Sequence, residues 1–263
     1  MRAFGPLVRD IAAPLAAFVA VVMAWEGAVW AFSIAPFVLP APTIIVRTLV
    51  DDWPMLSDAL MTTLGVTLKA LALAILGGVG LALLFAHSKW VERALLPFAV
   101  IVQVTPVIAI APLLLIWMEP ETAVLVSAFL VAFFPILANT SMGLASTDRG
   151  LVDLFALCHA SRGRTLWRLK LPAALPYFMS GLRIGGGLAL VGAIVAELAA
   201  GASGKGAGLA FRITEAGYRL NIPRMFAALA LVSAAGLVLY GALAGLSWIT
   251  LRRWHESARG AER

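Results

Sequence analysis

Six long apolar stretches are the feature that most constrains how this chain can fold. They cover residues 11–35, 65–87, 94–117, 122–145, 177–201 and 225–248. Each exceeds the roughly 20 residues that an α-helix needs to cross a hydrocarbon core about 30 Å thick. Because a backbone inside lipid has to satisfy its own hydrogen bonds, runs of this length predict helices. The sequence therefore predicts an all-α fold, a polytopic membrane bundle of about six transmembrane helices in one domain over residues 1–263.

The composition agrees with a membrane protein and argues against a soluble one. Hydrophobic residues make up 62% of the chain and charged residues 13%, whereas a soluble domain has roughly 45–50% and 25%. In a soluble protein the net charge of +6 would suggest a nucleic-acid partner. Multispan proteins, however, collect lysine and arginine in their cytoplasmic loops. We therefore expect the lipid bilayer, and no nucleic acid, as a partner.

The distribution of basic residues predicts the orientation of the bundle. With six spans, both termini and the segments 88–93 and 146–176 lie on one side, which carries thirteen lysines and arginines against five on the other. Because these residues accumulate on the cytoplasmic side, both termini are expected in the cytoplasm. The first stretch continues past Glu26 with no clear cleavage site after a short core, so we interpret it as a retained helix and not a signal peptide.

The longest predicted cytoplasmic connection, residues 148–176, is basic and periodic. Connections between packed helices usually have about 2–8 residues, and a long ordered loop commonly binds a partner. Its leucines recur at helical spacing. Ser161 and Gly163 suggest a break between two short helices, while Pro172 and Pro176 suggest the end of the second helix and the entry to the fifth span. The segment is predicted to be an amphipathic helical hairpin; a solvated loop or a helix lying on anionic lipid are the alternatives.

The same segment resembles the cytoplasmic loop of the permease subunits of bacterial ABC importers. That loop has the form E-A-A, three residues, G, nine residues, I-x-L-P. Here Asp153 stands at the glutamate, His159 at the glycine, Leu169 at the isoleucine and Leu171-Pro172 at the Leu-Pro. The run LPAALP at 171–176 is similar to the subgroup for nitrate, sulfonates, taurine and thiamine precursors.

Motifs outside the hairpin resemble the same subgroup. They are Trp25-Glu26 in the first stretch, LPAP at 39–42, VTPVIAIAPLLLIW at 104–117, and Glu197 followed by GAGL at 206–209. The likeness covers nearly the whole chain. The sequence departs from the pattern in three places: Leu154-Phe155 replaces the Ala-Ala pair, His159 replaces the glycine, and Gly163 stands where a bulky residue is usual. The last two suggest that the turn has moved toward Gly163.

The resemblance implies a type I ABC importer permease in the bacterial inner membrane, with no catalytic chemistry of its own. It implies two copies of a cytoplasmic ATP-binding cassette ATPase, a second permease copy in a homodimer, and an extracytoplasmic substrate-binding protein. The hairpin would be the coupling helix that seats in the ATPase. The expected coupling residues are Asp153, Leu157, His159, Ala160, Arg162, Leu169, Leu171 and Pro172. The implied solute is a thiamine-precursor-like heterocycle or a sulfonate- or nitrate-type anion. The motifs in the third stretch and in the outer loop favour the heterocycle.

Four polar residues inside the apolar stretches are candidates for the pathway or its gate: Glu26, Gln103, Asn139 and Glu197. Ionisable groups at such depth are costly and usually face the bundle interior or water. The structural alternative is a hydrogen-bonded acid near the interface, which we favour for Glu26, and hydrogen bonds between helices for the two amides.

No pattern in the sequence predicts a catalytic centre, a metal site or a cofactor. The three histidines form no i, i+4 ligand pair, and the single Cys158 excludes an internal disulfide and a cysteine-based metal cluster. The glycine-rich run at 201–206 lacks the spacing of a phosphate-binding loop, so any ATPase is expected to be another chain. A stand-alone secondary transporter or channel is the alternative function, and a membrane-embedded enzyme ranks below it.

Overall fold

The computed structural model describes residues 4–201 and 207–252, and every regular element in these ranges is helical. The glycine-containing run at 202–206 and the chain ends at 1–3 and 253–263 lie outside the described residues. Five helices are long and apolar enough to cross a membrane, or six if the bent pair α4 and α5 is one span. The predicted all-α polytopic bundle is confirmed. In chain order the elements are α1 (Phe4–Ala31), α2 (Pro42–Asp51), α3 (Trp53–His87), α4 (Lys89–Val104), α5 (Val107–Trp117), α6 (Pro120–Ala145), α7 (Arg149–Leu157), α8 (Arg162–Thr165), a π-helical turn (Leu166–Lys170), α9 (Leu171–Ala200), α10 (Leu209–Tyr218) and α11 (Ile222–Leu251).

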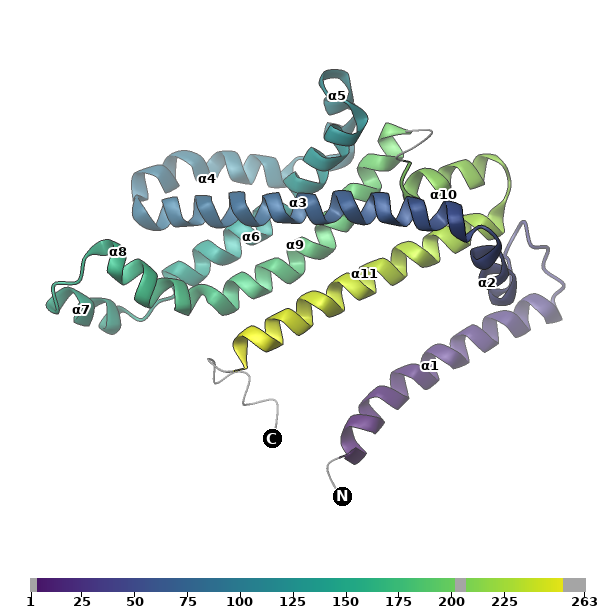
Figure 1. Cartoon of the computed structure of the whole chain (residues 1–263), viewed down its shortest axis with the longest axis horizontal. Helices are drawn as coiled ribbons and strands as arrows, with labels where there is room; N and C mark the ends of the chain where they lie inside the picture. Colours follow the sequence, from purple (N-terminus) through teal and green to yellow (C-terminus); the bar gives the residue numbers. More distant parts are fainter. Residues whose placement is uncertain (1–3, 202–206, 253–263) are drawn as a thin grey trace.

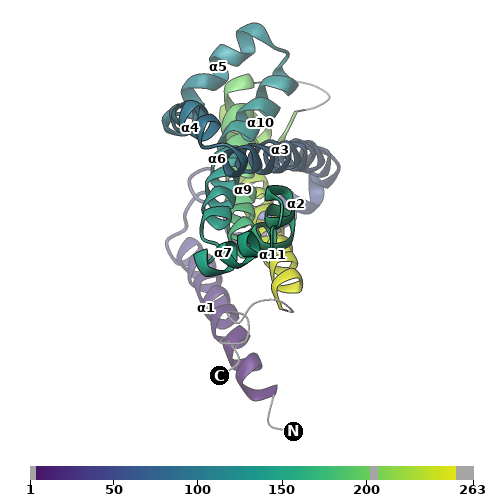
Figure 2. The same ribbon diagram turned by 90° about the vertical axis from the view of Figure 1, so that its left-hand side faces the viewer.

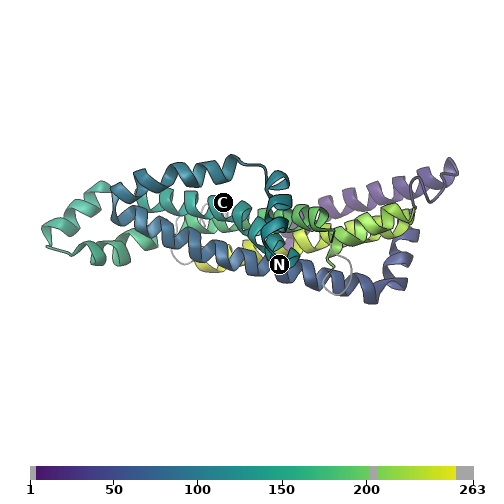
Figure 3. The same ribbon diagram turned by 90° about the horizontal axis from the view of Figure 1, so that it is seen from above.

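The long helices run roughly along one axis, with short helices at the two ends (Figure 1). We call the end formed by α7 and α8 the hairpin end, and the end formed by α2 and α10 the far end; Figure 3 shows the two ends separated along the molecule. Helix α1 lies beside the bundle in Figures 1 and 2 and packs mainly on α2. Its Trp25 reaches α11, where the ring centroids of Trp25 and Phe226 are 6.0 Å apart.

The core of the bundle is the close pair α6 and α9, with α3 packed against both. Small residues let the two backbones approach closely. Because lipid is as apolar as the side chains, membrane helices associate through such close packing and not through the hydrophobic effect. Gly181 and Gly185 repeat four residues apart on α9. A Cβ at Gly181 would lie 2.8 Å from the backbone oxygen of Pro135, and one at Gly185 would lie 3.1 Å from the backbone oxygen of Ala132. The α6–α9 contact therefore depends on the missing side chains.

The predicted span over 94–117 is not one continuous helix, because it is broken at Thr105 and Pro106. Helices α4 and α5 are bent by 100° at this point, and α5 projects steeply from the bundle (Figure 1). Thr105 and Pro106 both have extended backbone angles, because a proline ring clashes with a helical carbonyl four residues earlier and offers no N–H. The Thr105 N–H and hydroxyl both donate to the Ile101 carbonyl, at 3.1 and 2.7 Å, where α4 ends.

The predictions that Pro172 ends a helix and that Pro176 opens the next are wrong. A continuous helical segment runs from Arg162 to Ala200 through both prolines. The π-helical turn directly precedes Pro172, and the Leu171 N–H donates to the Leu166 carbonyl, five residues back. The wider turn leaves room for the Pro172 ring, which in a regular α-helix would clash with a carbonyl of the preceding turn. The hairpin is thus joined to α9 without an intervening loop.

Candidate functional site

The hairpin turn is built by two caps and one left-handed residue. Asp148 accepts the Leu151 N–H at 3.1 Å and starts α7, while Ser161 accepts the Arg164 N–H at 3.3 Å and starts α8. Between them His159 has φ of +51°. The Ala160 and His159 N–H groups donate to the Phe155 and Ala156 carbonyls, which is the Schellman pattern that ends many helices. The chain therefore bends at His159.

The expectation that the turn moves toward Gly163 is wrong. Gly163 lies inside α8, and a Cβ there would meet nothing within 4 Å. His159 instead occupies the left-handed position that usually belongs to glycine, because glycine adopts positive φ without steric cost. The bend therefore lies at His159, the position where the cytoplasmic loop of ABC importer permeases has its glycine.

The tip of the hairpin exposes apolar side chains. Leu154 is 52% exposed and Leu157 is 78% exposed on α7, and Asp153, directly before Leu154, is exposed as well. Trp167 in the π-helical turn is exposed as well. Leucines presented this way on a short amphipathic helix are typical of a surface that enters a partner's groove.

The expected coupling residues separate into three groups. Asp153, Leu157 and His159 are exposed at the tip. Ala160 and Arg162 line a cavity of about 370 Å³ between the hairpin and the end of α3, where His87 lies. The third group, Leu169, Leu171 and Pro172, forms the base of the hairpin. Leu171 packs on the bundle core beside Phe85 and Leu144.

At the far end, Glu26 of α1 caps the start of α2. Its carboxylate accepts the Thr43 N–H at 3.1 Å and the Thr43 hydroxyl at 2.8 Å. Pro42 occupies the first turn of α2, where its missing N–H costs nothing. A carboxylate is stabilised here because the first N–H groups of a helix are unpaired and carry partial positive charge.

Glu197 of α9 does the same for α10, but in a buried place. Only 7% of this residue is exposed. Its carboxylate accepts the Thr63 hydroxyl at 2.8 Å and the Ala210 N–H at 3.1 Å, and the Thr63 hydroxyl oxygen accepts the Leu209 N–H at 2.9 Å. Gly208 packs so closely on the carboxylate that a Cβ would overlap it. The cluster ties α3, α9 and α10 together.

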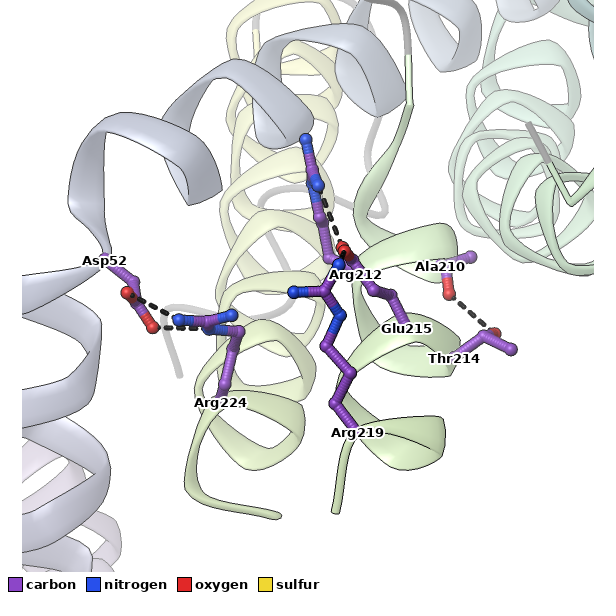
Figure 4. A network of polar contacts seen from close by, with 7 residues as sticks. All are labelled: Asp52, Ala210, Arg212, Thr214, Glu215, Arg219 and Arg224. Carbon is purple, nitrogen blue, oxygen red and sulfur yellow. Dashed lines mark hydrogen bonds and ion pairs between the residues drawn. The ribbon is translucent and has the colours of Figure 1, made fainter. Parts of the chain in front are cut away.

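Ion pairs add a second link across the far end (Figure 4). The Arg224 guanidinium donates to both carboxylate oxygens of Asp52, at 2.6 and 3.0 Å, which joins the α2–α3 corner to α11. Glu215 of α10 pairs with Arg212 and with Arg219, each at 2.9 Å. A two-point arginine–carboxylate pair sets orientation as well as distance, so the Asp52–Arg224 pair positions α11 relative to the start of α3, whereas the Glu215 pairs are local to α10.

A cavity of about 640 Å³ opens beside the Glu197 cluster. We call it the acidic cavity, after its three glutamates and one lysine. Lys69 lies near the middle of α3, and its Nζ is 3.8 Å from a Glu121 carboxylate oxygen. Glu119 and Glu121 flank Pro120 at the start of α6. The other walls come from α3, α6, α9 and α10, through Met61, Thr62, Gly65, Val66, Val124, Glu197, Ala200, Gly208 and Phe211.

The structure does not bring the four candidate pathway residues into one site. Glu197 alone among them lines the acidic cavity. Glu26 caps α2, Gln103 is exposed on α4, and the Asn139 side chain donates to the Pro135 carbonyl of its own helix at 2.8 Å. Sequence reasoning missed Lys69, although a lysine within an apolar helix is itself a signal of a functional site.

Comparison with known proteins adds a family and several relatives. Residues 74–247 match the family described as "Binding-protein-dependent transport system inner membrane component". The chain is 35% identical to the formylaminopyrimidine transport permease protein ThiX of Halalkalibacterium halodurans, over 82% of this chain and 86% of the relative. It is 33% identical to the riboflavin transport system permease protein RibX of Chloroflexus aurantiacus, over 89% and 86%.

A more distant relative and a solved structure extend the comparison. The putative aliphatic sulfonates transport permease protein SsuC of Bacillus subtilis is 30% identical over 85% of this chain and 80% of the relative. The crystal structure of an amino acid ABC transporter with histidines has a chain that superposes with a TM-score of 0.64 at 17% identity. The superposition covers 79% of this chain and 97% of that chain, and it supports the fold.

Proposed function

The chain belongs to the family of binding-protein-dependent transport system inner membrane components, and we propose that its hairpin is where a separate ATPase drives transport. As a member it is a multi-pass inner-membrane protein and the permease subunit of an ABC importer. The observation that carries the proposal is the exposed leucine surface at the tip of a hairpin whose second arm continues directly into a membrane helix.

The continuous helix from Arg162 to Ala200 supplies the mechanical connection. It has 39 residues, which at 1.5 Å per residue is roughly 58 Å. One end of it carries α8 and the π-helical turn, and the other carries Glu197 beside the acidic cavity. When nucleotide closes two ATPases, a hairpin seated in each would move with them, and a rigid rod would carry that movement to the far end. Nucleotide would thereby bias two states of the gate.

The remaining partners follow from the family and from the limited number of spans. We propose a homodimer with two ATPase copies at the hairpin end and a substrate-binding protein at the far end. The described part of a single chain offers five or six spans, and in the resembling importers the path runs between two permease halves. The far end, held by the Glu197 cluster and the Asp52–Arg224 pair, would receive the binding protein.

Labelling of Cys158 tests the proposed orientation without altering the hairpin. This cysteine is exposed beside the turn, on the side that the lysine and arginine distribution assigns to the cytoplasm. A membrane-impermeant maleimide is expected to leave it unlabelled in intact spheroplasts and to label it in inside-out vesicles. A Cys158→Ser, Asp51→Cys variant, with its thiol at the far end, should show the opposite pattern. Labelling of Cys158 in intact spheroplasts would reverse the topology.

Charge reversal at the hairpin tests coupling. The tagged chain, purified in mild detergent with its cellular partners, is expected to bring down an ATPase. A variant with Asp153→Arg and Arg162→Glu keeps the net charge but opposes the charges that orient the hairpin, because like charges across an interface are repulsive. Recovery of the ATPase, measured by mass spectrometry, should fall at least tenfold.

A matched control exchanges charges at the other end of the molecule. Arg47 and Asp51 are exposed on α2 with their charged groups 3.9 Å apart, so Arg47→Asp with Asp51→Arg should leave ATPase recovery unchanged. If the native chain brings down no ATPase under several gentle conditions, and moves solute along an ion gradient by itself, the coupling proposal is wrong. A stand-alone secondary transporter would then replace it.

Two solute classes are compatible with the family. Relatives at 33–35% identity are named for riboflavin and formylaminopyrimidine, and one at 30% is named for aliphatic sulfonates. We favour a small heterocycle for this chain because both higher-identity names are heterocycles. The alternative is a sulfonate- or nitrate-type anion.

A further inference from the structure

The charges that face the acidic cavity sum to a negative value. Glu119, Glu121 and Glu197 contribute three carboxylates, and Lys69 contributes one ammonium. Glu197 is committed to Thr63 and to the start of α10. Lys69 is 3.8 Å from Glu121, and the two side chains are 64% and 79% exposed, so this pair stays open to a ligand. Glu119 makes no side-chain cap to its own helix, which leaves its carboxylate available to a ligand as well.

The acidic cavity also has apolar lining side chains, among them one aromatic ring. Phe211 of α10 lines it together with Met61, Val66 and Val124. The Arg212 guanidinium carbon is 5.6 Å from the Phe211 ring centroid, and Arg212 pairs at 2.9 Å with Glu215, a carboxylate that it shares with Arg219. The volume of about 640 Å³ falls within the range of small-molecule sites, roughly 300–1,000 Å³.

We propose that the acidic cavity is a solute site that selects a flat heterocyclic ring bearing amino groups and disfavours a free oxyanion. This inference rests on the permease function proposed above and names the solute class for it. The ring would lie against Phe211 and the valines, while its N–H groups donate to Glu119 and Glu121. Hydrogen bonds to ionised carboxylates are the stronger kind. A sulfonate would meet two carboxylates for each available lysine, and like charges in a confined site repel.

Three small aromatic heterocycles test this selection on the full-length chain in nanodiscs. They are 4-aminopyrimidine, unsubstituted pyrimidine and pyridine-3-sulfonate, and saturation-transfer NMR measures their binding even when it is weak. The expected order of affinity is aminopyrimidine, then pyrimidine, then the sulfonate. Replacing both acids, as Glu119→Gln with Glu121→Gln, should weaken aminopyrimidine binding about tenfold or more and leave pyrimidine nearly unchanged.

Two further variants separate the acidic cavity from general charge effects. Asp58→Asn removes an exposed carboxylate of α3 that does not line the cavity, and it should change no affinity. Lys69→Met frees Glu121 and should strengthen aminopyrimidine binding. The inference is overturned if the sulfonate binds best and Lys69→Met abolishes its binding, or if no probe binds above an empty-nanodisc control. ATPase recovery through the hairpin is measured separately, so a sulfonate preference with normal recovery would remove this inference alone.

Discussion

Replacing Glu197 with alanine is expected to release α10 from the bundle and to destabilise the far end by about 3 kcal/mol. The estimate counts two hydrogen bonds to a buried carboxylate, at about 1.5–3 kcal/mol each, with partial recovery by water from the adjacent cavity. The Ala210 N–H and the Thr63 hydroxyl, which donate to Glu197 at 3.1 and 2.8 Å, would lose their acceptor. Hydrogen exchange of the segment 207–218 in nanodiscs should become markedly faster.

Two variants bracket this result. Gly208→Ala should resemble Glu197→Ala, because the new Cβ would overlap the carboxylate and displace it from the helix start. Glu26→Ala removes the corresponding cap of α2, but that carboxylate is only half-buried, so its cost should be near the ordinary cap value of about 1 kcal/mol. Unchanged exchange of α10 in Glu197→Ala would mean that the packing of α10 against α11 and α9 holds this helix without the buried carboxylate.

Gly181→Ala is expected to lower the thermal stability of the whole bundle, whereas Gly187→Ala is not. A Cβ at Gly181 would lie 2.8 Å from both the Asn139 Cβ and the Pro135 backbone oxygen. Backbone cannot step aside as a flexible side chain can, so α6 and α9 would have to separate. Overpacking of this kind typically costs about 1–3 kcal/mol, and α6 with α9 is the central helix pair.

Gly187 is the matched control because it lies on the same helix with open space around it. A Cβ there would meet nothing within 4 Å, and alanine favours a helix over glycine. The thermal midpoint of Gly187→Ala should equal or exceed that of the native chain. It is measured as the fraction recovered by size-exclusion chromatography after heating in one detergent. Equal losses in the two variants would show that helix flexibility, and not the α6–α9 contact, requires these glycines.

The apolar lengths alone predicted most helices, because the hydrocarbon core demands a minimum length and lipid demands internal hydrogen bonds. The helices α3, α6 and α11 overlap the stretches 65–87, 122–145 and 225–248. Prolines were harder to interpret. Pro106 bends the chain while Pro135 and Pro176 stay within helices, since neighbouring packing decides whether a lost backbone hydrogen bond breaks a helix.

The sequence by itself determined that this chain spans a membrane, that it carries one helical hairpin, and that acids occur where apolar residues are expected. Only the tertiary structure decided what those acids do. Glu26 and Glu197 are 17 and 13 residues from the N–H groups that they accept, and Thr63 is 134 residues from Glu197. Lys69 and Glu121 likewise come from different helices. No local spacing encodes such meetings, because helix caps, charge pairs and the acidic cavity form only when separate helices pack at a particular depth and rotation.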